Sequence, residues 1–230
     1  MAEFVLVHGG MHGGWCFAPL EKELQALGHT TLAPDLPIGD VGKSTIDYAD
    51  HLVEAMRGRV GDRAWLVGHS LGGFVVPRAA LKRKVGGLIY LCAGLPPRTE
   101  AEHQDNLSAF QQADAPQYMW DDQERINLGL QDAVQRFYHD CTSDQQLWAW
   151  SQLRPQWFGA FRDFVPIERY PDVPTHAILT TEDAMLNPHR YTELFQRRMD
   201  ITPELLPGSH SPFLSRPADL ARLMDRMVKA

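Results

Sequence analysis

The stretch Val67-Gly68-His69-Ser70-Leu71-Gly72-Gly73 follows an apolar run, Ala64–Gly68, and leads into an amphipathic stretch, Gly73–Leu81. It contains the pattern G-x-S-x-G, which is typical of a sharp turn from a β-strand into a helix. At such a turn the serine has a strained backbone conformation, and a side chain two residues before or after it would collide with its neighbours. The pattern therefore predicts that Ser70 stands clear of a strand end, at the positive end of the following helix.

Short apolar runs alternate with amphipathic stretches along most of the 230 residues. The expected strands are Phe4–His8, Thr30–Pro34, Ala64–Gly68, Leu88–Cys92, His176–Thr180 and Ile201–Leu206. The expected helices are Trp15–Leu27, Ser44–Val60, Gly73–Leu81, Pro188–Arg198 and Pro217–Val228. Most of the runs are apolar almost throughout, as in parallel strands that helices cover on both faces. The alternation predicts a doubly wound α/β sheet in a single domain, 1–230.

Residues 97–165 break this alternation, because they are polar, aromatic and helical in character, with no convincing strand. A long insertion between two strands is better interpreted as a lid over the carboxyl edge of the sheet than as a loop. The lid is rich in aromatic residues, so we expect an apolar, aromatic-walled pocket beneath it, with Trp120 and Trp148 as candidate lining residues.

A serine nucleophile needs a base and an acid that orients the base, and in this architecture both follow the serine, acid first. His210 lies in a glycine-containing loop between the last strand and the last helix, where a base reaches the sheet edge. Asp183 follows the penultimate strand, and its neighbour Glu182 is the alternative. Asp183 is preferred because its distance along the chain from His210 leaves one helix and one strand between them.

The loop after the first strand, Val7–Trp15, is rich in glycine. Acyl transfer passes through a tetrahedral oxyanion that needs two preorganised N–H donors. Leu71, directly after the candidate nucleophile, supplies one, and Gly10 is the preferred source of the other because glycine lets the backbone approach the substrate. His8 and His12 have metal-ligand spacing, but the glycines oppose a helix and no carboxylate lies between them. We therefore predict a site with no metal and no other cofactor.

Together these motifs resemble those of the α/β-hydrolase superfamily, and within it the plant methylesterase and hydroxynitrile lyase group with its bacterial esterase relatives. The motifs that carry the resemblance are Phe4–Trp15, Leu66–Gly73, Thr181–Asp183 and Gly208–Ser211, and much less specifically the stretch Phe137–Pro155 in the lid. The resemblance implies an α/β-hydrolase fold, with six parallel strands and a helical lid inserted between the fourth and fifth. It also implies the triad Ser70, Asp183 and His210, with Gly10 and Leu71 as oxyanion donors.

The same group contains ester hydrolases and carbon–carbon lyases, and three positions separate the two reactions. The lyases carry threonine, glutamate and lysine where this chain has Gly9, His69 and Ser211, which are also candidate pocket residues. All three positions are esterase-like, so we expect a serine carboxylic-ester hydrolase that acts through an acyl-enzyme. The alternatives are a hydroxynitrile lyase or C–C bond hydrolase on the same triad, or a non-catalytic receptor with the same fold.

The charge of the lid indicates the kind of ester. Residues 97–165 contain 11 acidic and 5 basic residues, so their net charge of −6 is nearly that of the whole chain, −7. An acidic entrance repels polyanions, and we therefore expect small, neutral, hydrophobic or aromatic esters rather than coenzyme A thioesters.

The remaining composition excludes other classes of protein. No basic run accompanies the 22 Lys and Arg residues, so nucleic-acid binding is not expected. The apolar stretches are shorter than the roughly 20 residues of a membrane helix, so no membrane partner is expected either. The three cysteines, Cys16, Cys92 and Cys141, are odd in number and indicate a reducing, cytoplasmic location. The oligomeric state stays open, with a homodimer as one alternative.

Overall fold

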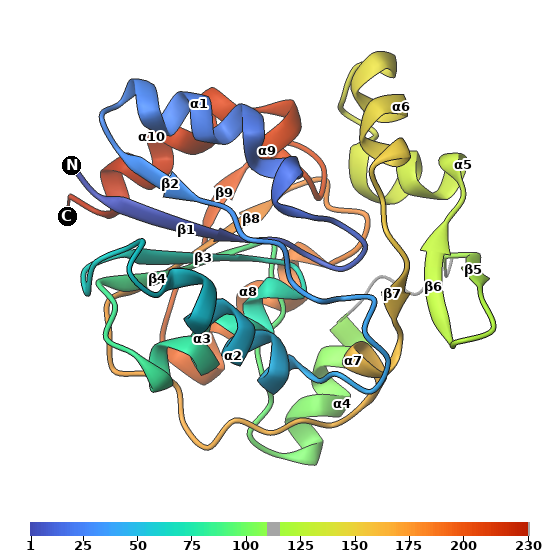
Figure 1. Ribbon diagram of the computed structural model, residues 1–230, viewed down its shortest axis with the longest axis horizontal. Coiled ribbons are helices and arrows are strands. Elements are labelled where there is room, and N and C mark those ends of the chain that lie inside the picture. The colour runs from blue at the N-terminus through green and yellow to red at the C-terminus, as the bar shows by residue number, and fades with distance from the viewer. Residues whose placement is uncertain (110–115, 230) are drawn as a thin grey trace.

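The centre of the protein is a six-stranded, all-parallel sheet in the order β2-β1-β3-β4-β8-β9 (Figure 1). The computed structural model describes residues 1–109 and 116–229. The strands are β1 (Glu3–Val7), β2 (Thr30–Leu32), β3 (Trp65–His69), β4 (Gly87–Leu91), β8 (Thr175–Thr180) and β9 (Glu204–Leu206). All six expected strands are present. The last begins at Glu204 rather than Ile201, since Pro203 has no N–H to donate to a neighbouring strand.

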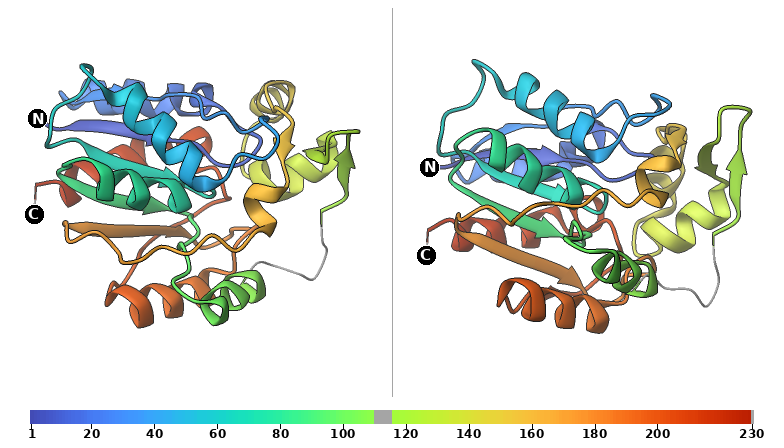
Figure 2. Two further views of the ribbon diagram at one scale, coloured as in Figure 1. Left: turned by 60° about the horizontal axis from the view of Figure 1, so that its bottom comes forward. Right: turned by 90° about the horizontal axis from the view of Figure 1, so that it is seen from below.

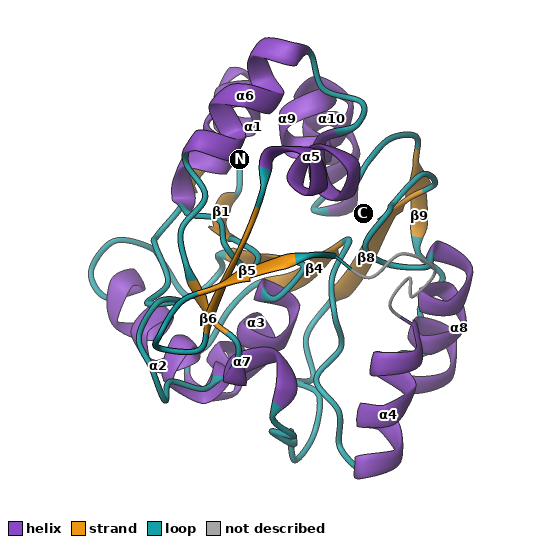
Figure 3. Ribbon diagram, turned by 90° about the vertical axis from the view of Figure 1, so that its right-hand side faces the viewer, coloured by secondary structure: helices purple, strands orange, loops and turns teal. Residues whose placement is uncertain are grey.

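Helices cover both faces of the sheet, which explains why its strands are apolar almost throughout (Figures 1 and 3). One face is covered by η1 (Gly14–Phe17), α1 (Ala18–Ala26), α9 (Pro212–Ser215) and α10 (Pro217–Met227). The other is covered by α2 (Thr45–Met56), α3 (Gly72–Lys82) and α8 (Pro188–Met199). The predicted doubly wound α/β fold is therefore confirmed. Among the residues described, no helix is long and apolar enough to span a membrane.

Between β4 and β8 the chain leaves the sheet and forms a separate layer at the carboxyl ends of the strands (Figures 1 and 2). Its helical elements are α4 (Glu100–Ala109), α5 (Leu130–Ala133), the π-helical turn η2 (Val134–Tyr138), α6 (Ser143–Ser151) and α7 (Gly159–Arg162). Residues 110–115 of the expected lid lie outside the described residues.

The expectation that this layer contains no strand was wrong. It holds a three-stranded antiparallel sheet of β5 (Tyr118–Trp120), β6 (Arg125–Leu128) and β7 (Gln156–Trp157). These strands are two to four residues long and partly exposed, so their side chains show no alternation long enough to recognise. β7 pairs with β6 from about thirty residues further along the chain, and no local sequence pattern encodes such a pairing.

Candidate active site

Ser70 sits at the turn between β3 and α3, with a positive φ of 51°. A Cβ atom on Gly68 would lie 2.7 Å from the carbonyl oxygen of Gly72. One on Gly72 would lie 2.4 Å from the carbonyl oxygen of Val7. Because both obstacles are backbone atoms, only glycine fits on either side of the serine, as the motif predicts. The tight turn places the Ser70 side chain at the wall of a cavity.

His210 lies in the loop between β9 and α9, and it lines the same cavity as Ser70. Its Nδ1 atom is 2.8 Å from Oδ2 of Asp183, and both side chains are almost fully buried. A carboxylate only accepts hydrogen bonds, so Nδ1 of His210 carries the proton and Nε2 is left free to accept one. The structure thus brings together the serine, histidine and aspartate that the sequence singled out.

Asp183, rather than Glu182, is the carboxylate beside the histidine. The other oxygen of Asp183, Oδ1, accepts the backbone N–H groups of Met185 at 2.7 Å and Leu186 at 2.9 Å. Glu182 is exposed, and its backbone N–H and C=O form hydrogen bonds with neighbouring loops. The two backbone hydrogen bonds fix the orientation of the Asp183 carboxylate, with Oδ2 toward His210.

His8 controls the orientation of the peptide that carries the Gly10 N–H. Its Nε2 accepts the backbone N–H of Leu36 at 2.8 Å, so its proton is on Nδ1, which donates to the carbonyl oxygen of Gly9 at 2.8 Å. In a trans peptide the N–H points away from the carbonyl, and the described chain contains no cis peptide. Holding the Gly9 carbonyl therefore directs the Gly10 N–H the opposite way.

His12 holds the next peptide of the same loop. Its Nδ1 donates to the carbonyl oxygen of Gly10 at 2.8 Å, and its Nε2 accepts the hydroxyl of Tyr138 at 2.7 Å. Burial lowers the pKa of His12 to about 3 and that of His8 to about 4, so both rings are neutral near pH 7. Each ring therefore has one donor and one acceptor nitrogen, and both nitrogens are used within the protein.

Arg154 connects the lid to this loop. Its backbone N–H donates to the carbonyl oxygen of Met11 at 2.8 Å, and its guanidinium donates to that of His12 at 2.8 Å. The guanidinium also lies 3.6 Å from the carboxylate of Asp35, which accepts the N–H of Gly14. The sequence suggested no role for Arg154 or Asp35 at the site. The polar contacts of both residues arise only when distant segments meet, so the sequence carries little signal of them.

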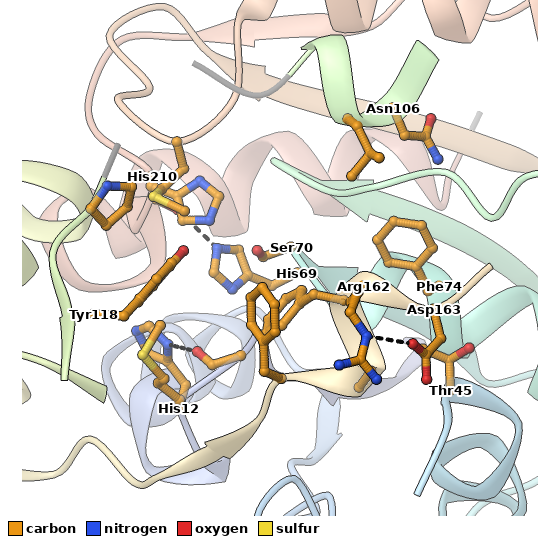
Figure 4. A pocket seen from close by; sticks show the side chains of 18 of the residues that line it. His12, Thr45, His69, Ser70, Phe74, Asn106, Tyr118, Arg162, Asp163 and His210 are labelled. Atoms are coloured by element: carbon orange, nitrogen blue, oxygen red, sulfur yellow. Dashed lines mark hydrogen bonds and ion pairs between the residues drawn. The ribbon is translucent and has the colours of Figure 1, made fainter. Parts of the chain in front are cut away.

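The cavity at the site has a volume of about 510 Å³ and lies between the carboxyl edge of the sheet and the lid (Figure 4). Ser70, His69 and His210 lie together at one part of its wall, as Figure 4 shows. The aromatic residues that line the cavity are Phe74, Tyr118, Phe137, Phe158 and Phe161. The charged residues that line it are Arg136, Arg162 and Asp163.

Two of the expected pocket residues do not line the cavity. Trp120 is 55% exposed and packs on Phe158, while Trp148 is 44% exposed and packs edge-on against Trp15. Both lie on the outer side of short lid elements. The sequence could not show which side faces outward, because these elements are too short for a recognisable alternation of polar and apolar residues.

The other expected residues lie beside the nucleophile. His69 lines the cavity and donates from Nε2 to the carbonyl oxygen of His210 at 2.9 Å. A Cβ on Gly9 would lie 2.8 Å from Cβ of Ser70, and one on Gly10 would lie 2.4 Å from Cζ of Phe161 in the lid. Ser211 is fully buried and is not part of the cavity wall. Leu71 occupies the N-cap position of α3, at the end of the helix where backbone N–H groups have no partner within the helix.

Comparison with known proteins agrees with this fold. The chain matches the model of the alpha/beta hydrolase family over residues 4–223 and belongs to that family. It is a hydrolase enzyme, and the predicted resemblance to plant methylesterases and bacterial esterases is confirmed.

Methyl jasmonate esterase 1 of Vitis vinifera is 27% identical, with 99% of this chain and 97% of that protein covered. The carbendazim hydrolyzing esterase of a Nocardioides strain is 35% identical over 119 residues, and this match covers about half of each protein (48% and 47%). Among solved structures, polyneuridine aldehyde esterase superposes with a TM-score of 0.81 at 22% identity, with 99% of each chain covered. The last comparison supports the fold.

Proposed function

We propose that this protein is a serine carboxylic-ester hydrolase that acts on small, neutral, hydrophobic or aromatic esters through an acyl-enzyme. The proposal rests chiefly on one observation. Ser70, held at a strained turn, shares a cavity wall with His210, whose Nδ1 is bonded to the buried carboxylate of Asp183 at 2.8 Å. This arrangement leaves Nε2 of His210 as the base facing the cavity. The relatives named as esterases agree with it.

The proposed reaction has two halves. His210 Nε2 takes the proton of Ser70 as its Oγ attacks the ester carbonyl carbon, and the N–H groups of Gly10 and Leu71 stabilise the oxyanion. Collapse of this intermediate breaks the ester bond, and the departing alcohol receives the proton from His210. In the second half, His210 removes a proton from water as it attacks the acyl-enzyme, and His210 then returns this proton to Oγ of Ser70 as the acid is released. Asp183 keeps the imidazole in the required tautomer throughout.

The walls of the cavity support the proposed substrate class. A volume of about 510 Å³ suits a small molecule, and five aromatic rings supply apolar contact area. Arg162 at the wall is paired with Asp163 at 2.8 Å, so this pair adds no net charge. The acidic lid would repel polyanions such as coenzyme A thioesters, so neutral esters should be the better substrates, although Arg136 leaves one positive charge at the cavity wall.

Labelling with a fluorophosphonate probe tests the nucleophile. We expect the wild-type protein to be labelled and the Ser70→Ala variant not to be, with ester hydrolysis lowered by several orders of magnitude and thermal unfolding little changed. A receptor without catalytic activity would hydrolyse no ester in a panel of p-nitrophenyl and methyl esters. Retention of a tenth of wild-type activity by Ser70→Ala would refute the assignment of Ser70.

A cyanohydrin assayed beside the esters tests the reaction type. Gly9, His69 and Ser211 predict that cleavage of mandelonitrile is absent or far slower than ester hydrolysis. Efficient release of cyanide, above the spontaneous rate, would instead support a lyase. The close approach of Gly9 to Ser70 and His69 also predicts that Gly9→Thr perturbs the nucleophile itself, because an added Cβ must displace the side chain of Ser70 or His69.

A further inference from the structure

Among the residues described, three arginines are more than nine-tenths buried: Arg78, Arg136 and Arg198. Arg78 donates to two backbone carbonyl oxygens at the end of the lid, and Arg198 donates to a side-chain amide and a backbone carbonyl, each at 2.8 Å. In both of these buried arginines the two terminal nitrogens have close oxygen acceptors, which offset part of the cost of burying a charge.

Arg136 differs from the other two. Its one hydrogen bond runs from Nη1 to the carbonyl oxygen of Ala184 at 3.4 Å, which is longer than the hydrogen bonds of Arg78 and Arg198, and its Nη2 has no acceptor in the described structure, whereas Nη1 and Nη2 of the other two both have one. The buried Nε lacks a described acceptor in all three arginines. No described carboxylate pairs with it, whereas the other four arginines of the lid, Arg98, Arg125, Arg154 and Arg162, each pair with one. Four of the five N–H donors of this guanidinium therefore lack an acceptor among the residues that the structure describes.

Arg136 lies at the candidate active site. It lines the cavity of the candidate active site, from the π-helical turn η2. The next residue, Phe137, stacks on the ring of His210 with centroids 5.8 Å apart, and Ala184 follows Asp183 in the chain. Arg136 thus lies on the His210 and Asp183 side of the cavity. A single π-helical turn in such a place is common at functional sites.

We propose that Arg136 binds a second oxygen acceptor of the substrate, a ketone carbonyl or a carboxylate in the same molecule as the reacting ester. A planar guanidinium with unfilled donors in an apolar cavity interacts strongly with such an oxygen and poorly with a hydrocarbon chain. The apolar walls would then hold the chain, and Arg136 would set its position relative to Ser70. This inference rests on the proposed function, because it assigns a specificity element to the same site.

The test uses esters that differ only in the second acceptor. Methyl 4-oxohexanoate and methyl 5-oxohexanoate carry a ketone too far from the ester to activate it strongly, and monomethyl adipate carries a carboxylate. Each is compared with methyl hexanoate by the ratio of kcat/KM. We expect a ratio of about tenfold or more for at least one of them in the wild-type protein. The ketone and carboxylate arms show which acceptor is preferred.

Substitution of Arg136 then identifies the origin of the preference. Arg136→Met should bring the ratio close to one, and Arg136→Lys should keep part of it, since lysine retains the charge but not the planar fork. Arg162→Met is the matched control, because Arg162 also lines the cavity but is already paired with Asp163. It should leave the ratio unchanged. A ratio near one in the wild-type protein, or an unchanged ratio in folded Arg136→Met, overturns the inference.

Binding to the Ser70→Ala protein separates this inference from the proposed function. Calorimetry with the same esters should show tighter binding of the preferred oxo-ester or half-ester than of methyl hexanoate, and Arg136→Met should remove the difference. This result would support the subsite even if no ester were hydrolysed. Equal affinities for all the esters would reject it even if the protein proved to be an active esterase.

Discussion

Replacing Asp183 by asparagine should reverse the tautomer of His210, because the structure dictates how the new amide must lie. Oδ1 of Asp183 accepts the N–H groups of Met185 and Leu186, and Oδ2 accepts Nδ1–H of His210 at 2.8 Å. An asparagine keeps the two backbone bonds only when its oxygen faces Met185 and Leu186. Its NH₂ group then faces His210 and donates to Nδ1, which forces the imidazole proton onto Nε2.

The expected loss of rate follows from this change. With a proton already on Nε2, His210 cannot take the proton of Ser70. Loss of the required tautomer lowers kcat by about 10³- to 10⁴-fold. That corresponds to about 4 to 5.5 kcal/mol of transition-state stabilisation. The variant should still fold, because asparagine has nearly the shape of aspartate and retains the bonds to the two backbone N–H groups.

The assay is hydrolysis of a p-nitrophenyl ester near pH 7.5, with thermal unfolding measured on the same samples. Glu182→Gln is the matched control, because Glu182 is the adjacent carboxylate and is exposed. It should cost less than about tenfold in kcat, since an exposed carboxylate interacts weakly with the site. If folded Asp183→Asn stays within tenfold of the wild type, or if Glu182→Gln is the more damaging change, the orienting role assigned to Asp183 is wrong.

Three further predictions concern the loop, the buried histidines and the substrate. Arg154→Met should lower kcat by roughly 10²-fold with little change in KM, because the oxyanion loop would be misplaced. Arg125→Met in the same lid is the control and should leave kcat unchanged. An effect of Arg154→Met on KM alone would contradict the role assigned to Arg154. Burial lowers the pKa of His8 to about 4 and that of His12 to about 3, so below pH 6.5 the unfolded chain binds more protons than the folded one. Each histidine should therefore lower the free energy of unfolding by about 2 kcal/mol between pH 7 and pH 5, as measured by urea denaturation. His8→Asn should remove its own share of this pH dependence, whereas His51→Asn should leave the dependence unchanged. A neutral aryl ester should have a higher kcat/KM than an acyl-CoA at low ionic strength, and equal turnover of the thioester would show that the lid charge does not face the entrance.

The features predicted correctly from the sequence are those that depend on neighbours in the chain. The turn at Ser70 follows from Gly68 and Gly72, because the clashes that exclude other residues arise within one turn and the adjacent strand. The six strands of the sheet follow from short apolar runs, since a strand covered on both faces must be apolar almost throughout. The preference for Asp183 over Glu182 also came from chain order and spacing alone, and the structure places Asp183 beside His210.

The structure of the lid could not be predicted from such local patterns. Its small antiparallel sheet went unpredicted, because two- to four-residue strands are stabilised by pairing with distant segments rather than by a recognisable pattern. Trp120 and Trp148 were expected in the pocket from composition, but composition does not say which side of an element faces inward. The cavity is lined instead by Tyr118, Phe158 and Phe161, among others.

The sequence by itself therefore determined the class of fold, the turn that presents Ser70, and the order in which the acid and the histidine follow it. Only the tertiary structure decided how the oxyanion loop is held and what the cavity offers to a ligand. His12 bonds to Tyr138 and Arg154 bonds to His12, and in each pair the two residues lie more than a hundred positions apart in the chain. That Arg136 has a single, long hydrogen bond among the described residues is visible only in the folded structure. Hydrogen bonds and burial depend on the distances between segments, and a linear pattern of residues does not contain those distances.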